Sequence, residues 1–166
     1  MTDVSGDAVG IVLARVDNRL IHGQIIESWV PALDVDCIVV ANNQLAAVAF
    51  QKTLMEAAVP RGIRVSIGCI EEMVDQLKSR DLEAHRILLL FANPRDALRA
   101  YRMGILFHEL NIGNLQGGKD KKRISCTVAL TGDDIAQLQA LEDHGVKIVL
   151  QCIPSDRRQL WRRSPD

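Results

Sequence analysis

The chain has 166 residues, with 20 Lys and Arg against 21 Asp and Glu, so its formal net charge is −1. General nucleic-acid and membrane-surface binders carry a basic excess, which is missing here. Two Trp, one Tyr and three Phe are too few for a platform that stacks single strands. No apolar run reaches the ~18 residues of a membrane span. Residues 1–10 contain no Lys or Arg, so we expect no secretory signal and a cytoplasmic location.

The four cysteines, Cys37, Cys69, Cys126 and Cys152, form no C-x-x-C pair. Each lies in or beside an apolar run, so we expect reduced thiols in the core. A zinc site needs clustered Cys and His residues, which the sequence does not offer. We therefore expect no metal and no organic cofactor.

Apolar runs and amphipathic stretches alternate along the chain. The apolar runs predict strands over residues 11–16, 37–41, 64–68, 86–92, 107–112, 124–130 and 147–153. Stretches with helical periodicity predict helices over residues 23–33, 44–59, 70–79, 93–104 and 131–144. Residues 113–123 are predicted as a loop and 155–166 as a basic C-terminal tail. This alternation predicts a single domain over residues 1–166. Its expected fold is a three-layer α/β/α arrangement, an open, mostly parallel twisted sheet with helices on both faces.

The segment that follows the first predicted strand carries the most chemistry. It places Arg15, Asp17, Arg19 and His22 within eight positions, directly before a helix that starts at Gly23. In open α/β sheets, ligands bind beyond the carboxyl ends of the strands, where the strand order reverses. We expect this reversal at the first strand, and therefore a functional loop here.

The residue types in this loop indicate phosphate chemistry. The guanidinium of Arg19 suits phosphoryl oxygens, and N–H groups at the start of the next helix favour an anion. Asp17 can hold His22 or an arginine through a charge-assisted hydrogen bond. A neutral imidazole is a competent nucleophile toward phosphorus. Gly23 has no Cβ, so a second protein could approach His22 closely. The alternative from the spacing alone is a loop of surface ion pairs in which His22 caps a helix.

The string RVDNRLIHGQI, followed by Trp29, closely resembles the active loop of the IIB components of the mannose/fructose/sorbose-type sugar phosphotransferase system (PTS). Weaker matches follow in the same order at Asn111-Ile-Gly, Thr131-Gly-Asp-Asp, Gly145-Val-Lys and Ile153-Pro154. The resemblance covers about residues 10–154. It implies a protein-N(pi)-phosphohistidine–sugar phosphotransferase component, that is, a phosphohistidine carrier.

The resemblance also implies roles for single residues. His22 matches the histidine that receives the phosphoryl group from a phospho-IIA protein and passes it to a sugar. Arg19 matches the arginine that steadies this group, while Asp17 and Arg15 match residues that frame the loop. Gln24 matches the polar residue at the helix start. With it, Asn18 and Gly23 are expected to line the phosphate site.

The implied partners are a IIA donor and the membrane components IIC and IID, which bind the sugar and hold the protein at the inner face of the membrane. We expect docking around His22, with Leu20 or Ile21 exposed and with Arg15 and Arg19 steering an acidic partner face. We expect no binding of nucleic acid or nucleotide.

One region departs from the family pattern. After the second strand the family usually places acidic residues, whereas this chain has Asn42-Asn43 and then Ala47-Val48. This departure leaves a second interpretation open. The protein could be a regulatory phosphocarrier or partner-binding module that does not itself move sugar.

Two further motifs resemble known sites only in part. Residues 113–120 almost match the nucleotide P-loop, but Asp120 stands where a hydroxyl should bind Mg²⁺, and a strand rather than a helix is predicted next. Cys152 and Arg158 fit the C-x₅-R spacing that cysteine phosphatases and cysteine-type IIB domains use. However, Pro154 removes an N–H from that segment and no glycine is present. We therefore interpret Cys152 as an apolar residue at the end of a strand.

Overall fold

The computed structural model describes residues 10–116 and 119–162. Its main sheet has seven strands in the order β3-β2-β4-β1-β5-β8-β9. The strands are β1 (Ile11–Asp17), β2 (Cys37–Ala41), β3 (Arg64–Gly68), β4 (Ile87–Phe91), β5 (Glu109–Asn114), β8 (Lys147–Leu150) and β9 (Gln159–Leu160). The first six are parallel and β9 is antiparallel to β8. The predicted three-layer fold with a mostly parallel sheet is confirmed.

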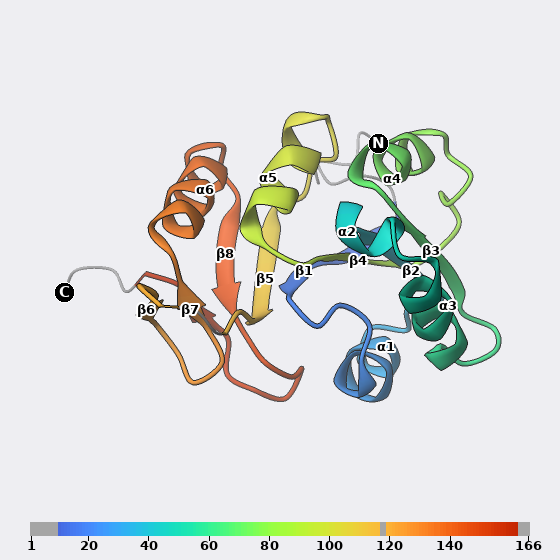
Figure 1. Cartoon of the computed structure of the whole chain (residues 1–166), viewed down its shortest axis with the longest axis horizontal. Coiled ribbons are helices and arrows are strands. Elements are labelled where there is room, and N and C mark those ends of the chain that lie inside the picture. The colour runs from blue at the N-terminus through green and yellow to red at the C-terminus, as the bar shows by residue number, and fades with distance from the viewer. Residues whose placement is uncertain (1–9, 117–118, 163–166) are drawn as a thin grey trace, which may run out of the picture.

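Helices cover both faces of this sheet (Figure 1). One face carries α4 (Ile70–Lys78), α5 (Pro94–Arg102) and α6 (Gly132–Asp143). The other face carries η1 (Ile25–Trp29), α1 (Val30–Ala32), α2 (Asn43–Ala46) and α3 (Ala49–Ala58). Successive side chains of a strand point to opposite faces, so β2 and β4 supply both cores. Cys37 and Val39 belong to the core under α4–α6, and Ile38 belongs to the other core.

Several predicted boundaries differ from the observed ones, including the end of the strand expected over 147–153, which stops at Leu150. The helix expected over 44–59 is two helices, because Val48 adopts a non-helical φ of −115° and ψ of 88°. The strand expected over 124–130 is reduced to β7 (Ala129–Leu130), which pairs with β6 (Lys122–Arg123). The backbone N–H groups of Ile124 and Ser125 donate to the Val128 carbonyl and form a turn instead. The strand expected over 107–112 is β5, which starts at Glu109 and extends to Asn114. Asn114 is paired with Asp17.

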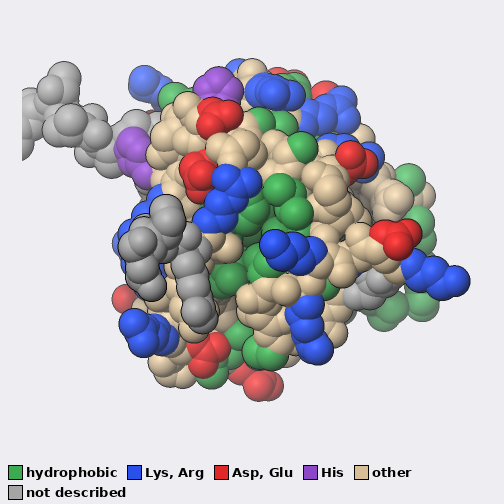
Figure 2. Space-filling model, turned by 90° about the vertical axis from the view of Figure 1, so that its left-hand side faces the viewer, with side chains coloured by type: hydrophobic (Ala, Val, Ile, Leu, Met, Phe, Trp, Pro, Cys, Tyr) green, Lys and Arg blue, Asp and Glu red, His purple; other side chains and the backbone are tan. Residues whose placement is uncertain are grey.

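The segment predicted as a basic tail is partly structured. It contains β9, and Trp161 is buried in the core under α6 with its indole N–H donating to Glu142. Arg158 pairs with Glu109 and Arg162 pairs with Glu142. Figure 2 looks onto the end that carries α6, β6 and β7, where Lys and Arg side chains are interspersed with acidic ones. Arg158 and Arg162 therefore belong to ion pairs on a surface of mixed charge.

The cysteines differ in burial more than the sequence indicates. Cys37 is buried and Cys126 is exposed, so the expectation of core thiols was wrong for Cys126. Burial raises the pKa of the Cys37 thiol to about 11. The thiolate is the reactive form, so we expect a thiol reagent such as Ellman's reagent to modify Cys126 in the folded protein and Cys37 only after unfolding. Cys126→Ser should remove the fast phase, and loss of that phase in Cys37→Ser would contradict this assignment.

Candidate active site

The loop that carries His22 begins at the centre of the carboxyl edge of the sheet. It follows β1, which lies between β4 and β5. The helix after β1 packs on one face of the sheet, whereas the helices after β4 and β5 pack on the other. Such a reversal opens a crevice beyond the strand ends. The loop after β1 therefore lies at the reversal of strand order that the sequence predicted.

Asp17 connects the charged side chains of this loop. Its Oδ2 lies 3.0 Å from Nε2 of His22, 3.3 Å from Nη2 of Arg19 and 3.4 Å from Nη2 of Arg15. Its Oδ1 accepts from the backbone N–H of Arg19 at 3.0 Å and from Nε of the same residue at 3.2 Å. The carboxylate of Asp17 thus contacts the other three candidate residues that the sequence placed in this loop.

Burial and hydrogen bonding act in opposite directions on Asp17. Burial alone raises the pKa of this carboxyl, but the hydrogen bonds from His22 and Arg19 outweigh burial and hold the pKa below its usual value. Asp17 is therefore ionised at neutral pH and has no proton to donate. Consequently the proton between Asp17 and His22 belongs to Nε2 of the imidazole. The Nδ1 atom remains available as a nucleophile.

The two arginines differ in their environment. Arg15 is fully buried, and this burial lowers its pKa to about 10, partly offset by Asp17, so it remains charged at neutral pH. Arg15 therefore cannot steer a partner, and that expectation was wrong. The side chain of Arg19 is 43% exposed and can reach a ligand outside the loop.

Two apolar side chains hold the loop from the protein interior. Leu20 and Ile21 are buried in the core beneath η1, so the expectation of an exposed apolar contact at these positions was wrong. Leu20 has a φ of +57°, a left-handed conformation that is unfavourable for a side chain with a Cβ. Its burial stabilises this conformation, which turns the chain from Asp17 toward His22.

The helix after the loop starts at Gly23, as predicted, but its middle is the π-helix η1. Pro31 has no N–H, so the usual bond to the carbonyl four residues earlier cannot form in this turn. The Val30 N–H bonds instead to the carbonyl of Ile25. Trp29, at the end of η1, donates from its indole N–H to the carbonyl of Cys152 at 3.1 Å. A Cβ on Gly23 would meet open space, so this position is accessible from outside.

The remaining predicted phosphate ligands lie at the rim of the loop. Gln24 accepts from Nη2 of Arg19 at 3.1 Å, and its Oε1 is 3.7 Å from Sγ of Cys152. The exposed Asn18 accepts from the Asn114 side chain at 2.6 Å. Asn18 and Gln24 therefore hold neighbours in place, and both border the surface on which Arg19 and His22 lie.

Residues 11–164 match the model of the family described as the PTS system sorbose subfamily IIB component. The chain is 34% identical over 146 residues to the sorbose-specific EIIB component of Lacticaseibacillus casei, covering 88% of this chain and 89% of that protein. It is 32% identical over 148 residues to the fructose-specific EIIB component of Bacillus subtilis, covering 89% and 91%. The crystal structure of the IIBSor domain of the sorbose permease from Klebsiella pneumoniae superposes with a TM-score of 0.86 at 31% identity, covering 92% and 93%.

The chain belongs to the sorbose subfamily of PTS IIB components. It is a phosphocarrier component of a sugar phosphotransferase system, and the resemblance found in its sequence is confirmed. Membership of this family implies IIA and IIC/IID partners in general. In the described ranges, no helix is long and apolar enough to cross a bilayer.

The asparagines that depart from the family pattern have structural roles in this IIB component. The Asn42 side chain caps α2 by accepting from the Leu45 N–H, and its amide lies 3.5 Å from Asp96. Asn43 accepts from the Ile70 N–H at 3.0 Å and so holds the start of α4. A carboxylate could make the same acceptor contacts but could not donate to Asp96 as the Asn42 amide does, so asparagine suits this edge of the sheet. Val48 is exposed.

The segment that partly matches a nucleotide P-loop does not have the structural context of a P-loop. Residues 117–118 of the P-loop-like segment lie outside the described residues, and the segment leads into β6 rather than into a helix. The absence of nucleotide binding stays a prediction. Over residues 10–116 and 119–162, no cluster of three metal-ligating side chains occurs.

The sequence alone did not identify four residues that support the loop. These are Trp29 and Asn111, noted only as parts of the family resemblance, and Gln151 and Cys152. The backbone carbonyls of Gln151 and Cys152 accept from Arg15 at 2.7 and 2.9 Å. A buried arginine implies such acceptors, but the sequence does not show which segment supplies them.

Proposed function

We propose that His22 carries the phosphoryl group in this IIB component. It takes the group from a phosphohistidine of a IIA protein and passes it to a sugar held by IIC and IID at the inner face of the membrane. The observation that carries this proposal is the 3.0 Å contact between Nε2 of His22 and the ionised Asp17. This contact fixes the tautomer and leaves Nδ1 to attack phosphorus, with the exposed Arg19 beside it.

In the first transfer, Nδ1 of His22 attacks phosphorus as the N–P bond of the donor histidine breaks. The donor nitrogen leaves with the bonding electron pair. The His22 ring keeps its proton on Nε2 and becomes a cation, which Asp17 stabilises. Arg19 stabilises the equatorial phosphoryl oxygens, where charge is spread during transfer.

In the second transfer, a sugar hydroxyl attacks phosphorus in line with Nδ1. The Nδ1–P bond breaks, its electron pair returns to the ring, and the hydroxyl proton passes to solvent or to a base of the membrane components. Loss of the phosphoryl group restores neutral His22 with its proton still on Nε2. This scheme needs no metal from the chain, and it leaves the choice of sugar to IIC and IID.

Incubation with a ³²P-labelled phospho-IIA protein tests the proposal. We expect one labelled residue, His22, with a label that is stable in base and lost in acid, as is typical of a P–N bond. The phosphohistidine should be the Nδ1 isomer, which ³¹P and ¹⁵N NMR distinguish from the Nε2 isomer. His108→Ala, far along the chain in the segment before β5, is the matched control and should label like the parent. Label retained in His22→Ala, or found on Cys152, would refute this role of His22.

A further inference from the structure

The guanidinium of Arg15 is held by hydrogen bonds to residues outside the loop. Its Nη1 donates to Oδ1 of Asn111 and to the Gln151 carbonyl, and its Nη2 donates to the Cys152 carbonyl. The same Nη2 also lies 3.4 Å from Oδ2 of Asp17. The Trp29 ring lies 4.7 Å from the guanidinium carbon. The guanidinium therefore has one orientation, and this orientation directs it toward the carboxylate that holds His22.

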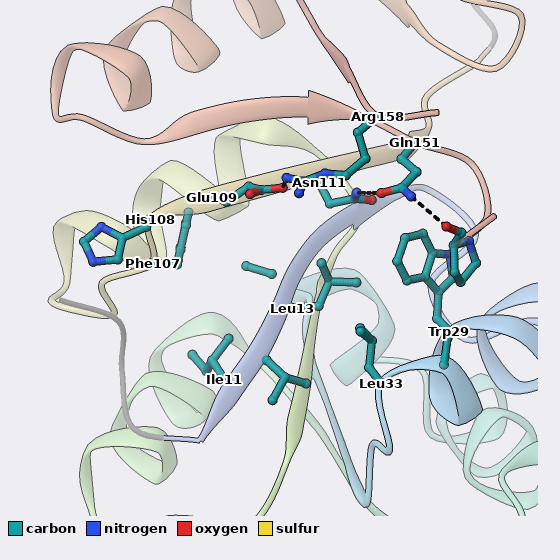
Figure 3. Close-up of a pocket in the computed structure, with 14 residues that line it drawn as sticks. Ile11, Leu13, Trp29, Leu33, Phe107, His108, Glu109, Asn111, Gln151 and Arg158 are labelled. Atoms are coloured by element: carbon teal, nitrogen blue, oxygen red, sulfur yellow. Dashed lines mark hydrogen bonds and ion pairs between the residues drawn. The ribbon is translucent and has the colours of Figure 1, made fainter. Parts of the chain in front are cut away.

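Asn111 lies opposite Arg15 in the parallel pairing of β1 and β5. Its amide cannot turn over, because its Nδ2 donates to Oε1 of Gln151 at 3.3 Å. Gln151 is oriented in turn, since its Nε2 donates to the carbonyls of Pro154 and Asp156 at 3.1 and 3.2 Å. The Asn111–Gln151 link is drawn in Figure 3. Two backbone carbonyls thus decide which end of the Asn111 amide faces Arg15.

Gly113 confirms how closely the guanidinium fits. A Cβ at this position would lie 1.7 Å from Nη2 of Arg15, so only glycine leaves room for it. Asn111 is itself 1% exposed, and it also borders a groove of about 560 Å³ that Trp29 and Gln151 line. It therefore lies behind the reactive loop, with almost no surface that could contact the phosphoryl group or a docked partner.

We propose that Asn111 is a positioning residue for phosphotransfer, which acts through Arg15 on Asp17 and so on the orientation of the His22 ring. This inference rests on the function proposed for His22. Without the Asn111 side-chain oxygen, Nη1 keeps only the Gln151 carbonyl as an acceptor, so the guanidinium is held less firmly in the position that faces Asp17. Asp17 then loses its buried counter-ion contact, and the ring of His22 is less firmly held.

The test measures transfer from ³²P-labelled phospho-IIA to the full chain carrying Asn111→Leu, which has nearly the same volume but no acceptor. We expect kcat to fall roughly 10- to 100-fold, as for small displacements of reacting groups. The KM for the donor should stay unchanged, because Asn111 does not reach the surface. The ¹⁵N shifts of the His22 ring should show loss of the fixed Nε2–H form. Leu138→Ala, on the buried side of α6 and on the opposite face of the sheet, is the control for lost stability and should change neither readout.

Gln151→Leu supplies an independent variant if Asn111→Leu does not fold. It should give the same change in the His22 shifts, and the double variant should be no slower than Asn111→Leu alone. Parent-like kcat and His22 shifts in either folded variant would overturn the inference, while labelling of His22 would still support the proposed function. A parent chain that is not labelled at His22 would instead overturn the proposed function and this inference with it.

Discussion

Replacing Asp17 by alanine is expected to lower the free energy of unfolding by about 3–5 kcal/mol, because it leaves a buried charge without its partner. Both Asp17 and Arg15 have side chains with no exposed surface. Among the described residues, Asp17 is the one acidic side chain paired with Arg15. Chemical denaturation of the parent and variant measures the difference. Arg95→Ala, which removes an exposed arginine 3.9 Å from a different aspartate, is the control and should change stability little.

Asp17→Asn separates the electrostatic role of this side chain from its shape. The amide is nearly isosteric but cannot hold Nε2 of His22 by a charge, so we expect transfer to slow by on the order of 10³- to 10⁴-fold. A variant that transfers at the parental rate would show that the contact at 3.0 Å has no part in the reaction.

The stabilisation due to Asp17 should depend on pH in one direction. The pKa of Asp17 is lowered in the folded protein, so its contribution is full above the unfolded value of about 3.9 and is lost as the pH falls through the folded pKa. The difference in unfolding free energy between parent and Asp17→Asn should therefore be constant near neutral pH and shrink below about pH 4. A difference that grows in acid would contradict the assignment.

The sequence predicted the layers of the fold well, but it predicted the ends of individual helices and strands less well. Continuous apolar runs such as CIVVA and the start of α5 at Asn93-Pro94 depend on local signals, and the structure has both. The helix break at Val48 could not be predicted, because no glycine or proline lies near it in the sequence. Residues 124–130 alternate like a strand, although Val128 and Leu130 are buried beside a turn. There, packing against the rest of the chain determined the outcome, which local periodicity cannot show.

The candidate site was predicted where its residues are close in sequence. Asp17, Arg19 and His22 meet in the structure because they share one tight loop. The depth of Arg15 could not be predicted in this way. It depends on Asn111, which is 96 residues away, and on the chain at Gln151, which is 136 residues away. The same holds for Leu20 and Ile21, whose burial depends on how the loop folds back onto η1.

Arg19→Ala should slow phosphotransfer by about 3 kcal/mol in the barrier, the typical cost of removing one preorganised charge-stabilising donor. Part of its guanidinium is bound by Asp17 and Gln24, at 3.2 and 3.1 Å. The side chain is therefore oriented before the phosphoryl group arrives, yet it is 43% exposed and can reach that group. Because Arg19 fills no part of the core, the free energy of unfolding should change by less than about 1 kcal/mol.

Arg19→Lys distinguishes the forked geometry of this side chain from its charge. A lysine keeps the charge but offers one point of contact, so it cannot bind Asp17 and a phosphoryl oxygen in the arrangement that the guanidinium allows. We expect Arg19→Lys to recover only part of the rate lost in Arg19→Ala, with the KM for phospho-IIA changed less than kcat. Rapid-quench measurement of single-turnover ³²P transfer gives the rates of the parent, Arg19→Lys and Arg19→Ala, which are compared at matched thermal stability. Equal rates for parent and Arg19→Ala would remove Arg19 from the reaction and leave the helix start at Gly23 as the stabilising group.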